Sequence, residues 1–284
     1  MHMINIALCF AVRNCEKYLA DIFANIERLK ILNINTYCIF VYDNCNDRSA
    51  NMLEEYQNKY PENVIVRTIE NTSQLRTVRI ASARNTCLQI LYKKLIDNDL
   101  IDIKYHIMID GDNRCIAKWD IDLIDKYLNN FDNDDWDCIS FNRRKYYDTW
   151  ALMFDDFKHH CWGYGNEKDC RAVSAIMLKC INSKLENCKT NSIEVMSAFN
   201  GFAIYKTERF RGFYYDGLYS NIKKLITDDE RKSTLNMLKN IYNLDIESLE
   251  NHCDFIGQSC DCNFFHLSAF QAGRKIKISK FKVI

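Results

Sequence analysis

The sequence predicts an α/β fold with a doubly wound, mostly parallel central sheet flanked by helices in a single domain. Three observations support this class. Short apolar runs alternate with amphipathic ones in the first half, polar residues follow each apolar run, and no linker rich in Pro, Gly or Ser divides the 284 residues. Apolar strands joined by helical crossovers are typical of parallel sheets that are covered on both faces.

Four short runs rich in β-branched and aromatic residues are predicted as strands. They are Ile4–Val12, Tyr37–Asp43, Val64–Ile69 and His106–Asp110. Segments between them carry apolar residues three and four positions apart, which predicts helices. They are Glu16–Leu32, Asp47–Tyr60, with Asp47 as its cap, and Val78–Ile96.

The pattern becomes irregular after an apolar run at Asp137–Phe141. A further strand is predicted at Phe202–Tyr205 and a helix at Leu218–Ile241. We interpret this second half as a variable part of the same domain.

The composition indicates a packed globular protein. Hydrophobic residues make up 48% of the chain and aromatic residues 13%, and 38 basic residues balance 38 acidic ones. This balance gives no long-range attraction to nucleic acid or to an acidic membrane surface. The 14 cysteines are spread along the chain without a signal peptide or a membrane-spanning apolar run, so we expect reduced thiols and a cytoplasmic location.

The segment Asp110-Gly111-Asp112 places two carboxylates one residue apart, directly after a predicted strand. Doubly wound sheets bind ligands in the crevice beyond the carboxyl ends of their strands. Two hard oxygen ligands there can hold Mn²⁺ or Mg²⁺ against a diphosphate, and the glycine lets the backbone turn closely. A plain turn is the alternative, because Asp, Gly and Asn favour tight turns.

Four ordered segments make the chain resemble the capsule-associated mannosyltransferase-like glycosyltransferases of fungi and similar GT-A enzymes of large DNA viruses. The segments are Arg79–Asn85, Ile109–Asp112, Tyr147–Leu152 and Phe199–Lys206. The resemblance implies a GT-A fold, a nucleoside-diphosphate-sugar donor, a glycan or glycoprotein acceptor and a divalent metal. Residues 1–115 would form the nucleotide-sugar-binding half and residues 116–284 the acceptor-side half. A viral origin would place the protein in the host cytoplasm.

The resemblance also implies roles for individual residues. Asp112 is the expected direct metal ligand, with Asp110 as its partner. The nucleotide sugar would be held by Arg13, Asp43, Asn44, Arg79, Arg84, Asp110 and Gly111. A guanidinium group can bind either a phosphate of the donor or a carboxylate of the protein. The alternative for each arginine is therefore an ion pair within the protein that has only a structural role.

Two further motifs suggest contacts with sugars. Tyr147–Trp150 offers aromatic rings beside the Asp148 carboxylate, although Trp150 can equally be a core residue. Gly201 precedes a predicted strand, where it would let a sugar approach the backbone or simply allow a turn.

The catalytic base is open among three carboxylates. Related enzymes carry an acidic residue in a Cys-Glu-His-like segment near the C-terminus, where this chain has Cys253-Asp254-Phe255. We therefore expect Asp254 first, with Asp148 and Glu194 as alternatives, because the base must reach the acceptor hydroxyl.

The C-terminal histidine and cysteines allow two metal interpretations. His266 would complete the shell of the divalent metal, unless it is a structural histidine. A zinc site among His252, Cys253, Cys260, Cys262 and His266 is disfavoured, because Cys-x-Cys without a second paired motif is not a usual zinc arrangement.

The leading prediction is a metal-dependent transfer of a hexose or deoxyhexose to a glycan, without a nucleic-acid partner or a membrane span. A sugar nucleotidyltransferase is one alternative, but it would normally carry a Gly-rich basic loop where this chain has Phe10–Cys15. A catalytically silent module of the same fold that binds a nucleotide or a glycan is another. The retained carboxylate pair argues against that module.

Overall fold

The computed structural model describes residues 4–129, 135–144, 146–155, 157–159, 161–164, 166–244, 246 and 257–284. Within them lies one eight-stranded sheet. Its strands are β1 (Ile4–Val12), β2 (Ile34–Asp43), β3 (Val64–Ile69), β4 (Ile103–Asp110), β5 (Cys138–Asn142), β6 (Ser192–Val195), β7 (Phe202–Lys206) and β8 (Ile276–Lys282). The strand order is β3-β2-β1-β4-β7-β5-β8-β6.

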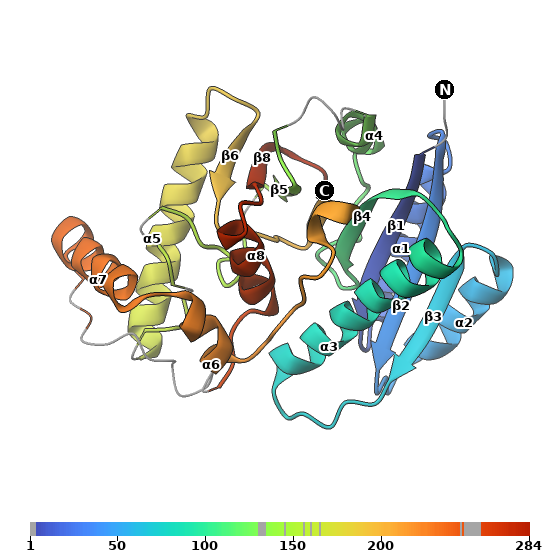
Figure 1. The fold of residues 1–284 in the computed structure, drawn as a ribbon, viewed down its shortest axis with the longest axis horizontal. Coiled ribbons are helices and arrows are strands. Elements are labelled where there is room, and N and C mark those ends of the chain that lie inside the picture. The colour runs from blue at the N-terminus through green and yellow to red at the C-terminus, as the bar shows by residue number, and fades with distance from the viewer. Residues whose placement is uncertain are drawn as a thin grey trace.

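Helices connect the strands and cover both faces of the sheet (Figure 1). The α-helices are α1 (Glu16–Leu29), α2 (Ser49–Lys59), α3 (Arg76–Gln89), α4 (Ile121–Asn129), α5 (Glu167–Glu186), α6 (Tyr219–Ile222), α7 (Asp228–Tyr242) and α8 (Asp261–Gln271). The π-helix η1 (Ile90–Asn98) continues α3, and two 3-10 helices are η2 (Thr207–Phe210) and η3 (Lys223–Leu225). Among the described residues, no helix combines the length and the apolar character needed to cross a membrane.

Most strands of the sheet point the same way. Strands β3, β2, β1 and β4 are mutually parallel, β5 is parallel to β8, and β7 runs antiparallel to both β4 and β5. The carboxyl ends of β1, β2, β4, β5 and β8 therefore meet at the same edge of the sheet. This arrangement confirms the predicted α/β class with a doubly wound, mostly parallel sheet, and β6 and β7 make it mixed.

The sheet is apolar on both faces, as its buried strands predict. In β1, Ala7 and Cys9 belong to the core that contains α3, η1, α5 and α8, whereas Leu8 and Phe10 belong to the core that contains α1 and α4. Figure 1 shows α3 crossing the near face of β1, β2 and β3. The start of α8 packs against α3. Asp261, the first residue of α8, bonds Arg84 of α3, although 177 positions separate them.

The predicted elements of the first half are confirmed, with small changes at their ends. Strands β1 and β3 have the predicted bounds, and β2 and β4 begin three residues earlier. Asp47 lies just before α2, and its carboxylate accepts hydrogen bonds from the backbone N–H groups of Ser49 at 3.0 Å and Glu16 at 3.1 Å. Asp47 thus joins the starts of α1 and α2.

The second half differs more from the prediction. The single helix expected at Leu218–Ile241 is wrong, because the chain leaves the helix at Ile226 and Thr227 caps a new one, α7. Thr227 and Glu230 form a capping box there, which satisfies the first free backbone N–H groups of the new helix. The helices α4, α5 and α8 were not predicted.

Candidate active site

A cavity of about 510 Å³ opens at the carboxyl ends of β1, β2 and β4. It is bounded by strand ends, by one face of α3 and by the first turn of α8. Its charged lining residues are Arg13, Asp43, Arg76, Arg79, Arg84, Asp110, Asp112, Arg114, Asp148 and Asp261. Carboxylates and guanidinium groups are therefore mixed around one hollow.

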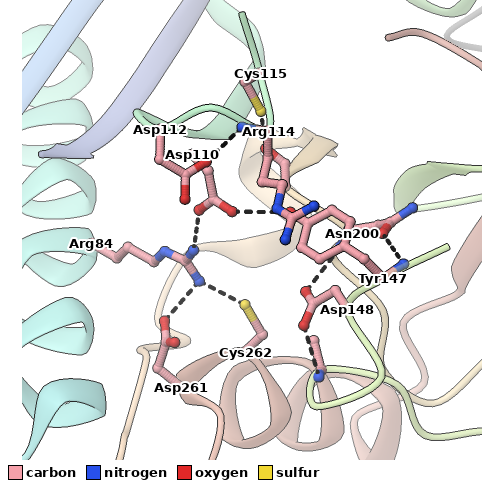
Figure 2. Close-up of polar contacts among 12 residues, drawn as sticks. Arg84, Asp110, Asp112, Arg114, Cys115, Tyr147, Asp148, Asn200, Asp261 and Cys262 are labelled. Carbon is pink, nitrogen blue, oxygen red and sulfur yellow. Dashed lines mark hydrogen bonds and ion pairs between the residues drawn. The ribbon is translucent and has the colours of Figure 1, made fainter. Parts of the chain in front are cut away.

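Asp110, the first carboxylate of the pair, is held on two sides. Its Oδ1 lies 3.0 Å from a guanidinium nitrogen of Arg84, and its Oδ2 lies 3.3 Å from the hydroxyl of Tyr147 (Figure 2). The side chain is nevertheless part-exposed to the cavity. Its orientation is therefore fixed before any ligand binds.

Asp112, the second carboxylate, is less constrained. Its Oδ1 accepts a hydrogen bond from the backbone N–H of Arg114 at 2.9 Å, and no described cation forms an ion pair with it. Burial raises the pKa of Asp112, and the negative charge of Asp110 raises it further. A Cβ at Gly111, which lies between them, would approach the Val12 side chain to 3.3 Å.

Arg84 joins three parts of the chain. Only 5% of the residue is exposed, and its guanidinium bonds Asp110, the Asp261 carboxylate at 2.7 Å and the Cys262 sulfur at 2.7 Å (Figure 2). It also lies 4.3 Å from the ring centroid of Phe199. Arg84 is thus the centre of a buried ion-pair network, the alternative that the sequence left open for it.

Asp43, at the end of β2, lines the same cavity. The residue is 4% exposed, and neither of its carboxylate oxygens accepts a hydrogen bond from a described residue. The nearest cation is Arg79, whose Nε lies 3.8 Å from Oδ2 while one of its terminal nitrogens bonds the Ser73 carbonyl at 2.7 Å. Buried acceptors without donors are uncommon, so Asp43 is suited to a ligand's N–H or O–H group.

The other two strand-end residues differ in their positions. Arg13 is exposed at the rim of the cavity and lines it. Asn44 is also exposed but does not line the cavity, and its φ of 40° turns the chain toward α2. The structure therefore brings Arg13, and not Asn44, to the candidate site.

Asp148 lies on the opposite wall, beside Tyr147 and Trp150. Its two oxygens accept hydrogen bonds from the backbone N–H groups of Asn200 at 3.1 Å and Ala151 at 3.3 Å (Figure 2). Burial is the main cause that raises the pKa of Asp148 to about 6, with a smaller contribution from Asp110. This carboxylate can therefore exchange a proton near neutral pH.

Gly201 allows the Tyr147 hydroxyl to pack close to the backbone beside Asp110. Its φ is 84°, and a Cβ at this position would lie 2.5 Å from the Tyr147 hydroxyl and 3.4 Å from the Asp110 carboxylate. A side chain would therefore displace Tyr147 from Asp110. The glycine serves the packing of protein groups around the cavity.

Besides Asn44, two described residues that the sequence predicts for the site, Glu194 and His266, are not brought to the cavity. Glu194 is exposed on β6, the last strand at the opposite end of the sheet order. His266 is fully buried in α8, where its ring nitrogens lie 2.9 Å from the Tyr205 hydroxyl and 3.2 Å from the Ser197 hydroxyl, and burial lowers its pKa to about 3. His266 is therefore packed as a core residue and does not line the cavity that Asp110 and Asp112 face. Asp254 lies outside the described residues.

The C-terminal cysteines do enter the cavity wall. Cys260, Asp261 and Cys262 have their ligand atoms within 4.8 Å of one another, a spacing that a metal could use. The Arg84 guanidinium already contacts two of them, and both ring nitrogens of His266 are engaged elsewhere. The described residues therefore do not favour a zinc site.

Sequence reasoning missed several residues of the cavity. Asp261 is the most important, because it is a buried carboxylate within 2.7 Å of Arg84. Arg114 was missed too, and its guanidinium lies 4.5 Å from the ring centroid of Tyr147. For Arg114 the signal was present, since it follows the carboxylate pair by two residues. No local pattern marked Asp261, because its contact depends on where α8 packs.

Several solved structures are similar to this chain. TarS 1–349 from S. aureus is 14% identical, with 82% of this chain and 54% of that chain covered and a TM-score of 0.42. A mannosyltransferase from Pyrobaculum calidifontis, in complex with GDP-Man and Mn²⁺, is 12% identical, with coverage of 75% and 48% and a TM-score of 0.39. Glucosyl-3-phosphoglycerate synthase from Mycobacterium tuberculosis, in complex with Mn²⁺, UDP and phosphoglyceric acid, is 9% identical, with coverage of 85% and 66% and a TM-score of 0.39.

The chain spans about half the length of the first two of these proteins. No protein-family model and no curated protein sequence matches it. At these identities and TM-scores, the likeness carries no argument about this chain, and the function has to be argued from the site.

Proposed function

We propose that this chain is a metal-dependent glycosyltransferase that transfers a sugar from a nucleoside-diphosphate sugar to a glycan acceptor. One observation carries the proposal: Asp110 and Asp112 face a cavity of about 510 Å³ that arginines also line. This size is within the range of small-molecule sites. A metal-bound diphosphate requires carboxylates for the ion and cations for the phosphates, and both are present here.

The donor atoms of the site fit a hard divalent cation. Asp110 and Asp112 offer carboxylate oxygens, which Mg²⁺ and Mn²⁺ prefer. Burial raises the pKa of Asp112 and the charge of Asp110 raises it further, and a bound cation would offset the repulsion between the two carboxylates. Asp112 is the proposed direct ligand because Arg84 and Tyr147 already hold Asp110. When bound, the ion would neutralise charge on the departing nucleoside diphosphate.

The nucleoside would bind at the ends of β1 and β2. Asp43 supports this, since its two buried oxygens have no described donor and can accept from a ribose hydroxyl or a base N–H. Arg13, Arg76 and Arg79 line the same cavity as Asp43 and Asp112, and their guanidinium groups can bind phosphate oxygens. In this proposal residues 1–115 supply most of the donor site.

The acceptor would enter from the part formed by residues 116–284. Tyr147 and Trp150 offer ring faces there, and Asp148 offers a carboxylate whose pKa is about 6. We assign Asp148 the role of general base, which takes the proton from the acceptor hydroxyl as the new bond forms. Asp254 remains a competing assignment and is tested beside it.

The test is to incubate the protein with Mn²⁺ and a panel of nucleotide sugars. The panel includes UDP-GlcNAc, UDP-Glc and GDP-Man, which are bound in similar solved structures. Slow release of a free nucleoside diphosphate, dependent on Mn²⁺, is the expected result. Formation of a nucleotide sugar from a nucleoside triphosphate and a sugar 1-phosphate, with release of pyrophosphate, would instead indicate a nucleotidyltransferase. Thermal stabilisation without any turnover would indicate a silent binding module.

A further inference from the structure

A second cavity, of about 680 Å³, lies at the same edge of the sheet as the candidate active site. It is formed where β5 and β8 end, under the C-terminal half of α5. Because β5 and β8 are parallel and Asn142 pairs with Lys282, the residues that follow one strand lie beside the end of the other. We call this hollow the basic cavity.

The basic cavity is lined by four cations and one carboxylate. The cations are Arg143 and Arg144 from the end of β5 and Lys280 and Lys282 from β8, and the carboxylate is Glu186 at the end of α5. Within the described part of the chain, no carboxylate forms an ion pair with any of the four. The chain as a whole is balanced at 38 basic and 38 acidic residues, so this excess of positive charge is local.

Arg143 connects the basic cavity to the active site. Its Nε donates to the Asn200 carbonyl at 2.9 Å, another of its nitrogens donates to the Arg114 carbonyl, and its guanidinium lies 5.4 Å from the Tyr147 ring centroid. A third nitrogen donates to the Cys115 sulfur at 3.5 Å, so the partners are backbone oxygens, a thiol and a ring, and none of them is a carboxylate. Tyr147 lines the active site, and the two cavities are therefore neighbours along one edge.

We propose that the basic cavity binds an anionic group, a phosphate or a carboxylate, of the glycan acceptor. Cations that converge on a hollow without carboxylate partners repel one another, and a bound anion offsets that repulsion. Leu178 and Leu185 add an apolar wall that suits the carbon face of a sugar ring beside the anionic group. The identification of the ligand as an acceptor rests on the proposed glycosyltransferase function, whereas the anion site itself does not.

The experiment is calorimetric titration of the full chain at low ionic strength, without metal or nucleotide. Four probes are compared: inorganic phosphate, glucose 6-phosphate, glucuronate and glucose. We expect glucose 6-phosphate to bind and neutral glucose not to bind. Binding of glucuronate as well would assign the site to carboxylate-bearing and phosphate-bearing acceptors alike, and its absence would assign it to phosphate.

Three variants locate the binding. Lys280→Gln with Lys282→Gln should weaken glucose 6-phosphate binding about tenfold or more, since two cations are lost. Lys118→Gln with Lys232→Gln removes the same charge from exposed lysines outside both cavities and should leave the affinity unchanged. Glu186→Gln removes the one carboxylate that lines the cavity, and it should tighten binding.

The proposal is overturned if no anionic probe binds, or if the first double variant binds as tightly as the unchanged protein. The second result would mean that the anion binds among the arginines of the donor site instead. A protein that shows the expected pattern but releases no nucleotide from any nucleotide sugar would keep the anion site and lose the glycosyltransferase assignment. The two proposals can therefore fail separately.

Discussion

The two cavities at the carboxyl edge of the sheet differ in how their charges are arranged. The active-site cavity mixes five carboxylates with five arginines, several of them paired. The basic cavity has four cations and one carboxylate, and no described carboxylate is paired with its cations. A site with both signs of charge can bind a metal and a diphosphate together, whereas a site with one sign suits a simple anion.

A second contrast lies within the active site. Asp110 is fixed by Arg84 and Tyr147, whereas Asp112 is held by a single backbone N–H group. The first carboxylate thus belongs to the protein's own ion-pair network, and the second is available to a ligand. Substitutions at the two sets of residues should therefore have different consequences, and the predictions below separate them.

The largest effect is expected for Asp112→Ala. Loss of the free carboxylate should reduce Mn²⁺-dependent nucleotide release by about three orders of magnitude, because charge on the leaving diphosphate would no longer be stabilised. The release of nucleoside diphosphate measures it. Asp122→Ala, an exposed carboxylate of α4 outside the cavity, is the matched control and should keep full activity. Full turnover in Asp112→Ala would remove the metal from the mechanism.

Asp148→Asn should lower transfer to an acceptor by about a hundredfold or more, since the general base is lost. Donor binding should stay unchanged, because Asp148 lies on the wall opposite the strand ends that hold the nucleotide. Transfer rates and donor affinity are measured together. Asp254→Asn is compared in the same assay, and if it abolishes transfer while Asp148→Asn does not, the base is Asp254.

Arg84→Met tests the structural network and not the chemistry. It leaves the buried Asp261 carboxylate without its partner, which should lower the free energy of unfolding by about 3–5 kcal/mol. Denaturant unfolding measures the change. Arg171→Met removes an exposed ion pair with Glu167 and should cost no more than about 1 kcal/mol. Equal losses in the two variants would show that Arg84 contributes no more than a surface arginine.

The smallest effect on the transfer rate is expected from a change of pH. A base with a pKa of about 6 is protonated and inactive below that pH, so the transfer rate should rise by about tenfold per pH unit below 6 and level off above it. The pH profile of transfer at saturating metal measures this limb. A profile that keeps the same limb in Asp148→Asn would assign it to another group.

The donor side of this molecule could be predicted from sequence with good accuracy. Strands β1 and β3 were predicted with their observed bounds, because buried parallel strands are continuous apolar runs. The strand ends then placed Arg13, Asp43 and Asp112 around one hollow, since parallel strands share an edge. Local patterns were sufficient because these contacts follow from the direction of the strands.

The part of the cavity wall that α8 forms could not be predicted in the same way. Asp261 reaches Arg84 because α8 packs on α3, and His266 is satisfied by Tyr205 and Ser197 from other segments. Neither contact leaves a periodic signal in the sequence. The break at Thr227 is different, because Thr227 and Glu230 have the spacing of a capping box, which is a local signal in the sequence for the start of a helix.

The central claim is that Asp112 and a nucleoside diphosphate together bind a divalent ion. Electron paramagnetic resonance of Mn²⁺, titrated with and without UDP or GDP, tests it most directly. The account predicts that Mn²⁺ becomes protein-bound when a matching nucleotide is present, and that Asp112→Ala abolishes this binding. Equal Mn²⁺ binding in Asp112→Ala and in the unchanged protein would contradict it.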